Sequence, residues 1–260
     1  MNAKRVFPFR LITFDVTNTL LKFTANIGKT YGDIGRKYGV KCDTNELTDS
    51  FKHQFKKMSE ENPHFGYDTG LSWQNWWRRV VFDTFRRCHN DIADSKLDLI
   101  SQDLIEIYKT EFCWKPASGA LELLNYLQDR GVTLGVISNS DPRLHDILCN
   151  VKMDSYFKFI LTSHEVGYSK PDKRIFDRAM KESMLEDLKK RQCLHIGDNL
   201  EFDYEGAKRH GWNSFLITKK KLSKFSNQAE LEDKVFVDLI SLKEYMRAEW
   251  NEYEVPKHSP

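Results

Sequence analysis

The chain has 260 residues, of which 40% are hydrophobic and 30% are charged, an ordinary composition for a globular protein that buries a core. The 40 basic residues against 38 acidic ones leave a net charge of +2, without the basic excess that is typical of nucleic-acid-binding proteins. No apolar run approaches the roughly 20 residues of a membrane span. We therefore expect neither a nucleic acid nor a membrane as a partner.

The cysteines are scattered, odd in number and in no C-x-x-C pair, which argues against a disulfide framework and against a zinc site. They are Cys42, Cys88, Cys113, Cys149 and Cys193. Reduced thiols indicate a cytoplasmic protein and leave the nucleus open. Lys4, Arg5 and Arg10 faintly resemble a transit peptide, so the mitochondrion stays open too. The oligomeric state is not determined by the sequence.

The first predicted element is a short buried strand, residues 10–15 (RLITFD), which ends in an acid. The next segment, residues 23–112, is predicted to be helical, because its apolar residues recur at helical spacing. Two of its helices are expected at residues 31–38 and 47–58. Ser72 and Asp94 are the predicted N-caps of two more. We interpret this segment as a helical cap that is inserted into the core.

After the cap, short apolar strands alternate with helices. The predicted strands span residues 132–138, 157–162, 193–197, 214–217 and 235–237. The predicted helices span residues 118–129, 141–149, 172–183, 200–210 and 239–248. This alternation predicts an α/β fold, a doubly wound parallel (Rossmann-like) sheet with the cap inserted after the first strand. Residues 1–22 would hold the first strand and its loop, and residues 113–260 the remainder of the core.

Polar residues follow the strands at the edge where an open parallel sheet binds its ligands. They are Asp15, Thr17, Asn18, Thr19, Ser138, Asn139, Lys170, Asp198 and Asp203. A carboxylate can act as a nucleophile, and hard oxygen ligands hold Mg²⁺ together with a substrate phosphate. A lysine offsets the charge of a transferring phosphoryl group. Gly197 is expected to let the backbone turn sharply beside Asp198.

Four motifs in these positions resemble those of the haloacid dehalogenase-like hydrolase superfamily. They are FDVTNTL at 14–20, VISN at 136–139, SKPD at 169–172 and IGDNLEFD at 196–203. The resemblance covers essentially the whole chain, and the helical insertion matches the family's cap.

The resemblance implies a role for each matched residue. Asp15 would be the nucleophile, and Lys170 would neutralise both Asp15 and the phosphate. Asp15, Asp198 and the Thr17 carbonyl would hold Mg²⁺, and Asp203 would support the metal from behind these ligands.

A second set of matched residues would face the substrate, which the resemblance implies is a small phosphorylated molecule. Ser138 would bind the phosphoryl group, with Asn139 and Thr19 beside it at the substrate site. The cap would close over this site and select the substrate.

Thr17 departs from the pattern, because family phosphatases carry aspartate there as a general acid and base. Such help contributes typically ~10²–10⁴-fold, and a threonine hydroxyl cannot supply it near neutral pH. Asn18 replaces the usual glycine, and asparagine tolerates a left-handed conformation, so the loop is expected to persist.

Three functions stay open from the sequence. The first is a Mg²⁺-dependent hydrolase that acts on a small phosphorylated metabolite through an aspartyl intermediate and is weakened by Thr17. The alternative is a catalytically lapsed protein of the same fold that regulates or binds a phosphometabolite. Dehalogenation ranks third, because that reaction needs no metal and the metal-binding acids are all present.

Some of these residues also have plain structural interpretations. Asp198 could be the N-cap of the helix that follows it. His195 is expected to be a core histidine with satisfied hydrogen bonds, and His164 a structural or surface residue of the loop before Lys170.

Overall fold

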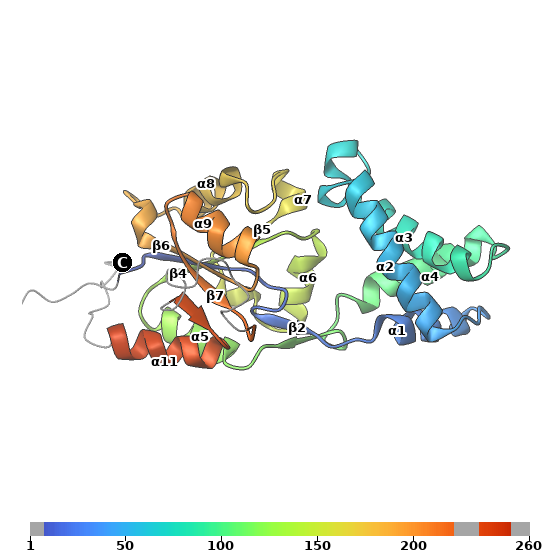
Figure 1. Ribbon diagram of the computed structural model, residues 1–260, viewed down its shortest axis with the longest axis horizontal. Coiled ribbons are helices and arrows are strands. Elements are labelled where there is room, and N and C mark those ends of the chain that lie inside the picture. Colours follow the sequence, from blue (N-terminus) through green and yellow to red (C-terminus); the bar gives the residue numbers. More distant parts are fainter. Residues whose placement is uncertain (1–7, 221–233, 251–260) are drawn as a thin grey trace, which may run out of the picture.

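The computed structural model describes residues 8–220 and 234–250. Figure 1 shows an α/β core built around a sheet and, at its side, a separate group of helices. The predicted α/β architecture is confirmed, with the helical group inserted after the first strand. Within the described ranges, no helix is both long and apolar enough to cross a membrane.

Among the described residues, the sheet has six strands in the order β5-β4-β1-β6-β7-β8, and every neighbouring pair is parallel. The strands are β1 (Leu11–Phe14), β4 (Thr133–Ser138), β5 (Phe159–Thr162), β6 (Cys193–Gly197), β7 (Asn213–Ile217) and β8 (Val235–Phe236). The chain proceeds from β1 to β4 and β5 on one side and then to β6, β7 and β8 on the other. The strand order therefore reverses next to β1, where open α/β sheets bind ligands.

Apolar clusters cover both faces of the sheet. Ile12 and Phe14 of β1 pack in one cluster, and Leu11 packs with Phe176 in another. Both faces of β1 are thus buried, as expected for a central parallel strand. The helices of the core are α5 (Ala120–Gln128), α6 (Arg143–Asn150), α7 (Ser163–Val166), α8 (Lys173–Glu182), α9 (Gly206–Arg209) and α11 (Leu239–Trp250).

The inserted helices form a core of their own, which includes Leu47, Phe85 and Leu97. They are α1 (Ile27–Lys37), α2 (Thr44–Glu61), α3 (Trp73–Cys88) and α4 (Asp94–Ile107), with the short helix η1 (His64–Thr69) after α2. We call α1–α4 and η1 the cap. The Ser72 side chain caps α3, as predicted, by accepting a hydrogen bond from the backbone N–H of Asn75. The prediction for Asp94 is wrong, because Ala93 occupies the N-cap position.

Two short strands lead into and out of the cap and pair with each other. They are β2 (Leu21–Phe23) and β3 (Trp114–Pro116), which form an antiparallel ribbon. Neither strand is predicted from the sequence, because three residues are too few to show a period of two. Figure 1 shows this ribbon between the sheet and α1. The two crossings of the chain between core and cap therefore lie side by side.

Close packing of α1 on α2 leads to a testable prediction at Gly28. A Cβ atom there would lie 2.0 Å from the Thr44 carbonyl oxygen and 2.2 Å from the Thr48 hydroxyl. We expect Gly28→Ala to lower the free energy of unfolding by about 1–3 kcal/mol, because the helices must separate. Chemical denaturation measures this change.

Gly32 on the same helix is the matched control, because its Cβ would meet no atom closer than 3.5 Å. Gly32→Ala should leave stability unchanged or raise it by up to about 1 kcal/mol, the gain in helix propensity. Equal stability of the Gly28→Ala and Gly32→Ala proteins would contradict the packing argument.

Candidate active site

Asp15 directly follows the central strand β1 and is fixed by the strands on either side. Its backbone N–H donates to the Ile196 carbonyl over 2.9 Å. Phe14 is in register with Val136 of β4 and with Ile196 of β6. The C-terminal ends of β4 and β6, at Ser138 and Gly197, therefore meet Asp15 at one edge of the sheet, as predicted.

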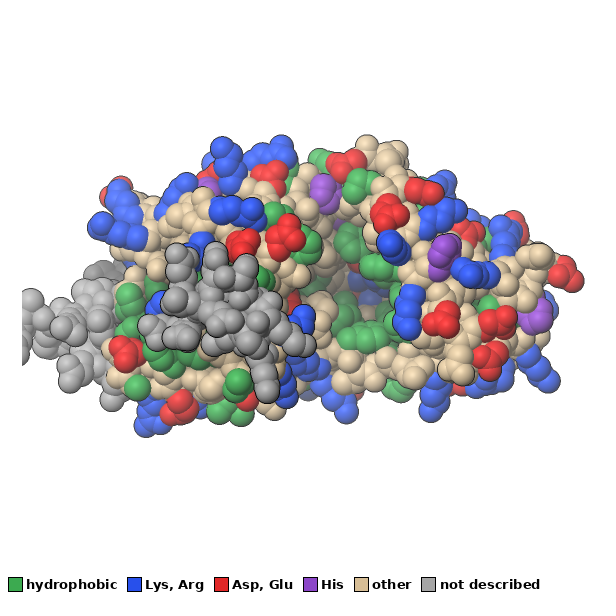
Figure 2. Space-filling view, in the orientation of Figure 1, with side chains coloured by type: hydrophobic (Ala, Val, Ile, Leu, Met, Phe, Trp, Pro, Cys, Tyr) green, Lys and Arg blue, Asp and Glu red, His purple; other side chains and the backbone are tan. Residues whose placement is uncertain are grey.

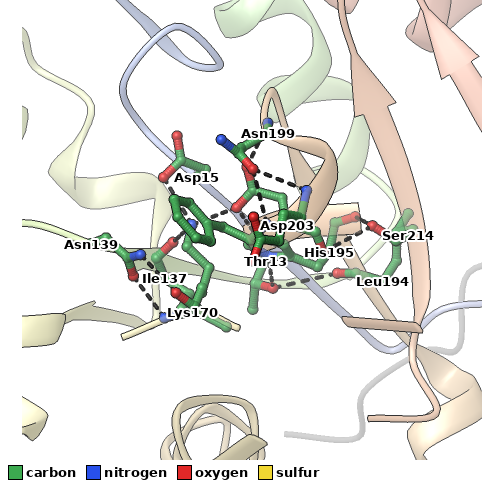
Figure 3. Close-up of polar contacts among 12 residues, drawn as sticks. Thr13, Asp15, Ile137, Asn139, Lys170, Leu194, His195, Asn199, Asp203 and Ser214 are labelled. Carbon is green, nitrogen blue, oxygen red and sulfur yellow. Dashed lines mark hydrogen bonds and ion pairs between the residues drawn. The ribbon is translucent and has the colours of Figure 1, made fainter. Parts of the chain in front are cut away.

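Lys170 reaches this edge from the loop before α8 and is almost fully buried (Figure 3). Its ammonium group donates to Asp15 Oδ1 over 2.9 Å and to the Ile137 carbonyl over 2.7 Å. It also lies 2.7 Å from Asp203 Oδ1. Burial lowers the pKa of Lys170, but the two carboxylates outweigh burial and raise it overall. Lys170 is therefore a buried, fully paired cation in contact with the candidate nucleophile.

The side chain of Asn139 holds the backbone at Lys170. Its amide nitrogen donates to the Lys170 carbonyl over 2.9 Å, and its carbonyl oxygen accepts from the Lys170 N–H over 2.7 Å. Asn139 thus connects the end of β4 to the lysine loop. The proposed contact of Asn139 with substrate stays a prediction.

Asp203 is fixed by a second chain of hydrogen bonds. Its Oδ1 lies 3.1 Å from His195 Nε2, and its Oδ2 accepts from the Asn199 N–H over 2.9 Å. His195 Nδ1 in turn lies 2.9 Å from the Thr13 hydroxyl. Burial lowers the pKa of His195, so the ring is neutral and can donate to Asp203 while it accepts from Thr13. The interpretation of His195 as a satisfied core histidine is confirmed, and its partner belongs to the site.

Three carboxylates gather at the sheet edge. Asp15, Asp198 and Asp203 each offer an oxygen atom, and these atoms all lie within 4.8 Å of one another. Burial, with smaller effects of Asp203 and Asp198, raises the pKa of Asp15 to about 7 although Lys170 opposes the shift. Burial and Asp203 also raise the pKa of Asp198. Lys170 and His195 hold the pKa of Asp203 well below its usual range despite its burial.

This pattern of charge fits a small divalent cation. Asp203 has both oxygens engaged in the contacts above, so it serves better as a support than as a ligand. Burial makes ionisation of Asp15 and Asp198 unfavourable, and a cation between them would offset that free-energy cost. Their hard oxygen atoms are the ligands that Mg²⁺ prefers.

The loop after Asp15 is a tight turn that contains the predicted left-handed residue. Asn18 has φ of 64°, so the prediction that asparagine tolerates a left-handed conformation in this loop is confirmed. The Leu21 N–H closes the turn on the Val16 carbonyl over 2.9 Å. Thr17 is exposed at the tip, whereas the Thr19 hydroxyl is buried without a hydrogen-bond partner among the described residues.

Gly197 is required because a side chain at this position would not fit, and not because of its backbone conformation. It is not among the glycines with positive φ, so the bend that follows at Asp198 does not depend on the conformational freedom of glycine. A Cβ atom at this position would instead lie 2.2 Å from Asp203 Cγ. Only glycine therefore lets Asp203 approach β6 closely enough to contact Lys170 and His195.

The segment after Asp198 is wound differently from the predicted helix. Asn199 is its N-cap and accepts from the N–H groups of Glu201 and Phe202, so the capping interpretation of Asp198 is wrong. A π-helical turn, η4 (Leu200–Glu205), precedes α9. Such turns are frequent at functional sites, and this one carries Asp203.

Sequence reasoning missed a contact that joins the core to the cap. Arg143 is buried and donates through Nε and Nη2 to the two oxygens of Asp141, over 2.9 and 2.8 Å. The Trp77 indole N–H, from α3 of the cap, donates to the same Asp141 carboxylate over 2.8 Å. Asp141 follows VISN at the end of β4, so the strand-end argument could have included it.

A second contact joins η1 of the cap to the lysine loop. His64 Nε2 lies 3.1 Å from the hydroxyl of Ser169, the neighbour of Lys170. His164 Nδ1 lies 3.0 Å from the His64 carbonyl oxygen, so its expected structural role is confirmed. His164 belongs to helix α7, where the sequence analysis expected a loop.

The fold and the four strand-end motifs agree with a comparison against known families. A family model described as haloacid dehalogenase-like hydrolase matches residues 9–211. The chain belongs to this family. The resemblance inferred from the motifs is thereby confirmed.

Relatives in animals match most of the chain. The rhythmically expressed gene 2 protein of Drosophila melanogaster is 48% identical over 82% of this chain and 84% of its own length. Haloacid dehalogenase-like hydrolase domain-containing protein 3 of Mus musculus is 35% identical over 80% of this chain and 81% of its own length.

Solved structures share the fold at lower identity. A 2-haloacid dehalogenase from Pseudomonas syringae has a TM-score of 0.64 at 20% identity, over 93% of this chain and 99% of its own. The putative hydrolase YfnB from Bacillus subtilis, bound to magnesium, has a TM-score of 0.60 at 20% identity, over 80% of this chain and 88% of its own.

The close approach of Asp203 to Gly197 gives one prediction. Gly197→Ala should lower the free energy of unfolding by about 1–3 kcal/mol, because the new methyl group displaces the Asp203 carboxylate. Asp203→Ala removes the carboxylate that the methyl group would meet. The double variant should therefore lose less free energy of unfolding than the two single variants lose together. If urea denaturation showed that the losses of the two single variants simply add in the double variant, the clash would not explain the effect of Gly197→Ala.

The buried Asp141 carboxylate gives a prediction about pH. Burial raises the pKa of Asp141, but Arg143 and Trp77 outweigh it and hold the pKa below its usual value. The stabilising contribution is therefore complete above the unfolded pKa of about 3.9 and is lost as the pH falls through the lower folded pKa.

Wild type should be more stable than Asp141→Asn by about 3–5 kcal/mol at pH 7, because the variant leaves Arg143 unpaired. This gap should shrink below about pH 4. Asp49→Asn, at a carboxylate that is 81% exposed, is the control. Denaturation at several pH values measures both, and a gap that stays constant from pH 7 to about pH 3 would contradict the assignment.

Proposed function

We propose that the protein is a Mg²⁺-dependent hydrolase of small phosphorylated molecules that works through an aspartyl phosphate on Asp15. The observation that carries the proposal is the buried Lys170 ammonium shared between Asp15 and Asp203. A cation in contact with a carboxylate, beside a further pair of acids, suits the transfer of a dianionic group.

In the first step, a carboxylate oxygen of Asp15 attacks phosphorus. Lys170 contacts Oδ1, which leaves Oδ2 for the attack. The bond between phosphorus and the ester oxygen breaks, and the leaving group takes the electron pair. Lys170 keeps its proton throughout and offsets charge on the carboxylate and on the phosphoryl oxygens.

In the second step, water attacks the phosphorus of the aspartyl phosphate. Inorganic phosphate departs with the hydroxyl group of that water, the remaining proton passes to solvent, and the Asp15 carboxylate is regenerated. The cap, fastened through Trp77 and His64, would limit entry of other water molecules. We infer that Ser138 and Thr19, which are both buried, would bind phosphoryl oxygens with their hydroxyl groups.

Bound Mg²⁺ would supply positive charge to the phosphoryl oxygens between Asp15, Asp198 and the Thr17 carbonyl. Support comes from the three carboxylates, whose oxygen atoms lie within 4.8 Å of one another, and from the magnesium reported for YfnB. Asp203 would hold Lys170 and the end of β6 in place behind these ligands.

Thr17 favours a second candidate function, a lapsed enzyme that binds a phosphorylated metabolite and regulates another process. No threonine hydroxyl can protonate an alkoxide or activate water near neutral pH. This candidate keeps the Lys170 network and the Mg²⁺ site, but it predicts binding of phosphate analogues without turnover.

A phosphate-ester panel with purified protein distinguishes the two candidates. We expect Mg²⁺-dependent turnover that Asp15→Asn abolishes, because the nucleophile is lost. Thr17→Asp should raise turnover of alkyl phosphates by about 10²-fold or more, because it restores a general acid.

Turnover by wild type that survives Asp15→Asn would refute the aspartyl mechanism. Activity of Thr17→Asp alone, with an inert wild type, would instead favour the lapsed enzyme. Halide release from a 2-haloacid by metal-free protein would favour dehalogenation.

A further inference from the structure

A cavity of about 650 Å³ opens between the core and the cap. Its floor includes Thr17 and Asn18 of the nucleophile loop and Asn139 at the end of β4. Its walls carry the aromatic residues Phe23, Phe51, Phe55, Phe65, Trp77, Tyr108 and Trp114. Figure 2 shows a hollow between the two parts of the molecule with hydrophobic side chains along it. A cavity of this size holds one small molecule.

The aromatic wall is built from rings that contact one another. Phe55 lies 5.5 Å from Trp76 and 5.7 Å from Trp77, measured between ring centroids. Phe51 stacks on Phe55 at 5.7 Å. An aromatic ring in the cavity would extend this cluster, and each ring pair adds about 0.5–1.5 kcal/mol beyond its buried area.

The charges in the cavity cancel. Among the described residues that line it, Arg143 is the one cation, and its Nε and Nη2 groups donate to Asp141. The Arg143 guanidinium also lies over the Trp77 ring, 4.2 Å from its centroid. A ligand carboxylate would therefore be buried without an unpaired cation to offset its desolvation. An uncharged group does not have this desolvation cost.

Thr17 adds a chemical restriction on the leaving group. Its exposed side chain lines the cavity, at the sequence position where family phosphatases carry the general acid. An alkoxide, whose conjugate acid is about as weak an acid as water, needs that proton. A phenolate, whose conjugate acid has a pKa of about 10, departs far more readily without it.

We propose that the cavity takes the uncharged aryl group of an aryl phosphate monoester. The proposal rests on the hydrolase function above and names its substrate class. The Asp15 carboxylate forms a bond to phosphorus as the bond from phosphorus to the phenolic oxygen breaks. The phenolate leaves with the electron pair and takes a proton from water.

Binding of inert analogues tests the class apart from turnover. With Mg²⁺ present, the dissociation constants of phenylphosphonate, methylphosphonate and phosphonoacetate are measured by quenching of tryptophan fluorescence, since Trp77 and Trp114 line the cavity. We expect phenylphosphonate to bind about tenfold more tightly than either of the others.

Phe55→Leu should reduce this preference several-fold, and Phe51→Leu is a second variant in case the first fails to fold. Phe112→Leu is the matched control, because Phe112 is 62% exposed and does not line the cavity. The Phe112→Leu protein should keep the wild-type preference for phenylphosphonate. Equal binding of the three phosphonates, or a preference that Phe55→Leu and Phe51→Leu leave intact, would overturn the proposal.

Turnover of phenyl phosphate separates this proposal from the hydrolase function. Preferential binding of phenylphosphonate without hydrolysis of phenyl phosphate would support the ligand class and contradict the hydrolase. Hydrolysis of small carboxylate-bearing phosphates, with no preference for phenylphosphonate, would support the hydrolase and overturn the ligand class.

Discussion

The buried ammonium group of Lys170 is the contact on which the candidate site depends. Its three partners are Asp15 after β1, the Ile137 carbonyl in β4 and Asp203 in the turn after β6. A buried lysine without such partners would lose its proton. The three segments must therefore stay together for the charge to persist. This requirement explains why a glycine faces Asp203 at position 197 and why Asn139 is hydrogen-bonded to the backbone of Lys170.

The cap carries the second constraint, because it contributes most of the aromatic cavity wall but little of the charge at the site. Trp77 joins it to the Asp141–Arg143 pair, and His64 joins it to Ser169 beside Lys170. Both contacts end on loops that also hold the strand-end residues. The cap is thus hydrogen-bonded to the two loops that carry Asn139 and Lys170, and the Asp141–Arg143 ion pair that Trp77 contacts also leaves the cavity without net charge.

Much of the core could be predicted from the sequence, because apolar strands and turn residues are local signals. The strand ends identified Asp15, Ser138, Lys170 and Asp198, and the structure brings them to one edge. The contacts that tune the site were harder to predict. The link from His195 to Asp203 depends on a π-helical turn, and the role of Gly197 depends on a side chain six residues away. Pairing across the chain, as in Trp77 with Asp141, leaves no periodic pattern at all.

The proposed mechanism requires phosphorylation of Asp15, and acetyl phosphate is the most direct probe of that step. Acetate needs no general acid to depart, because carboxylic acids ionise near pH 4, so Thr17 does not impede the first step. The aspartyl phosphate should then accumulate, since Thr17 cannot activate water for its hydrolysis. Acid quench, reduction with borohydride and peptide mass spectrometry should reveal homoserine at position 15 in the Mg²⁺-treated wild type. Unmodified Asp15 under these conditions, in protein that binds Mg²⁺, would contradict the aspartyl phosphate mechanism.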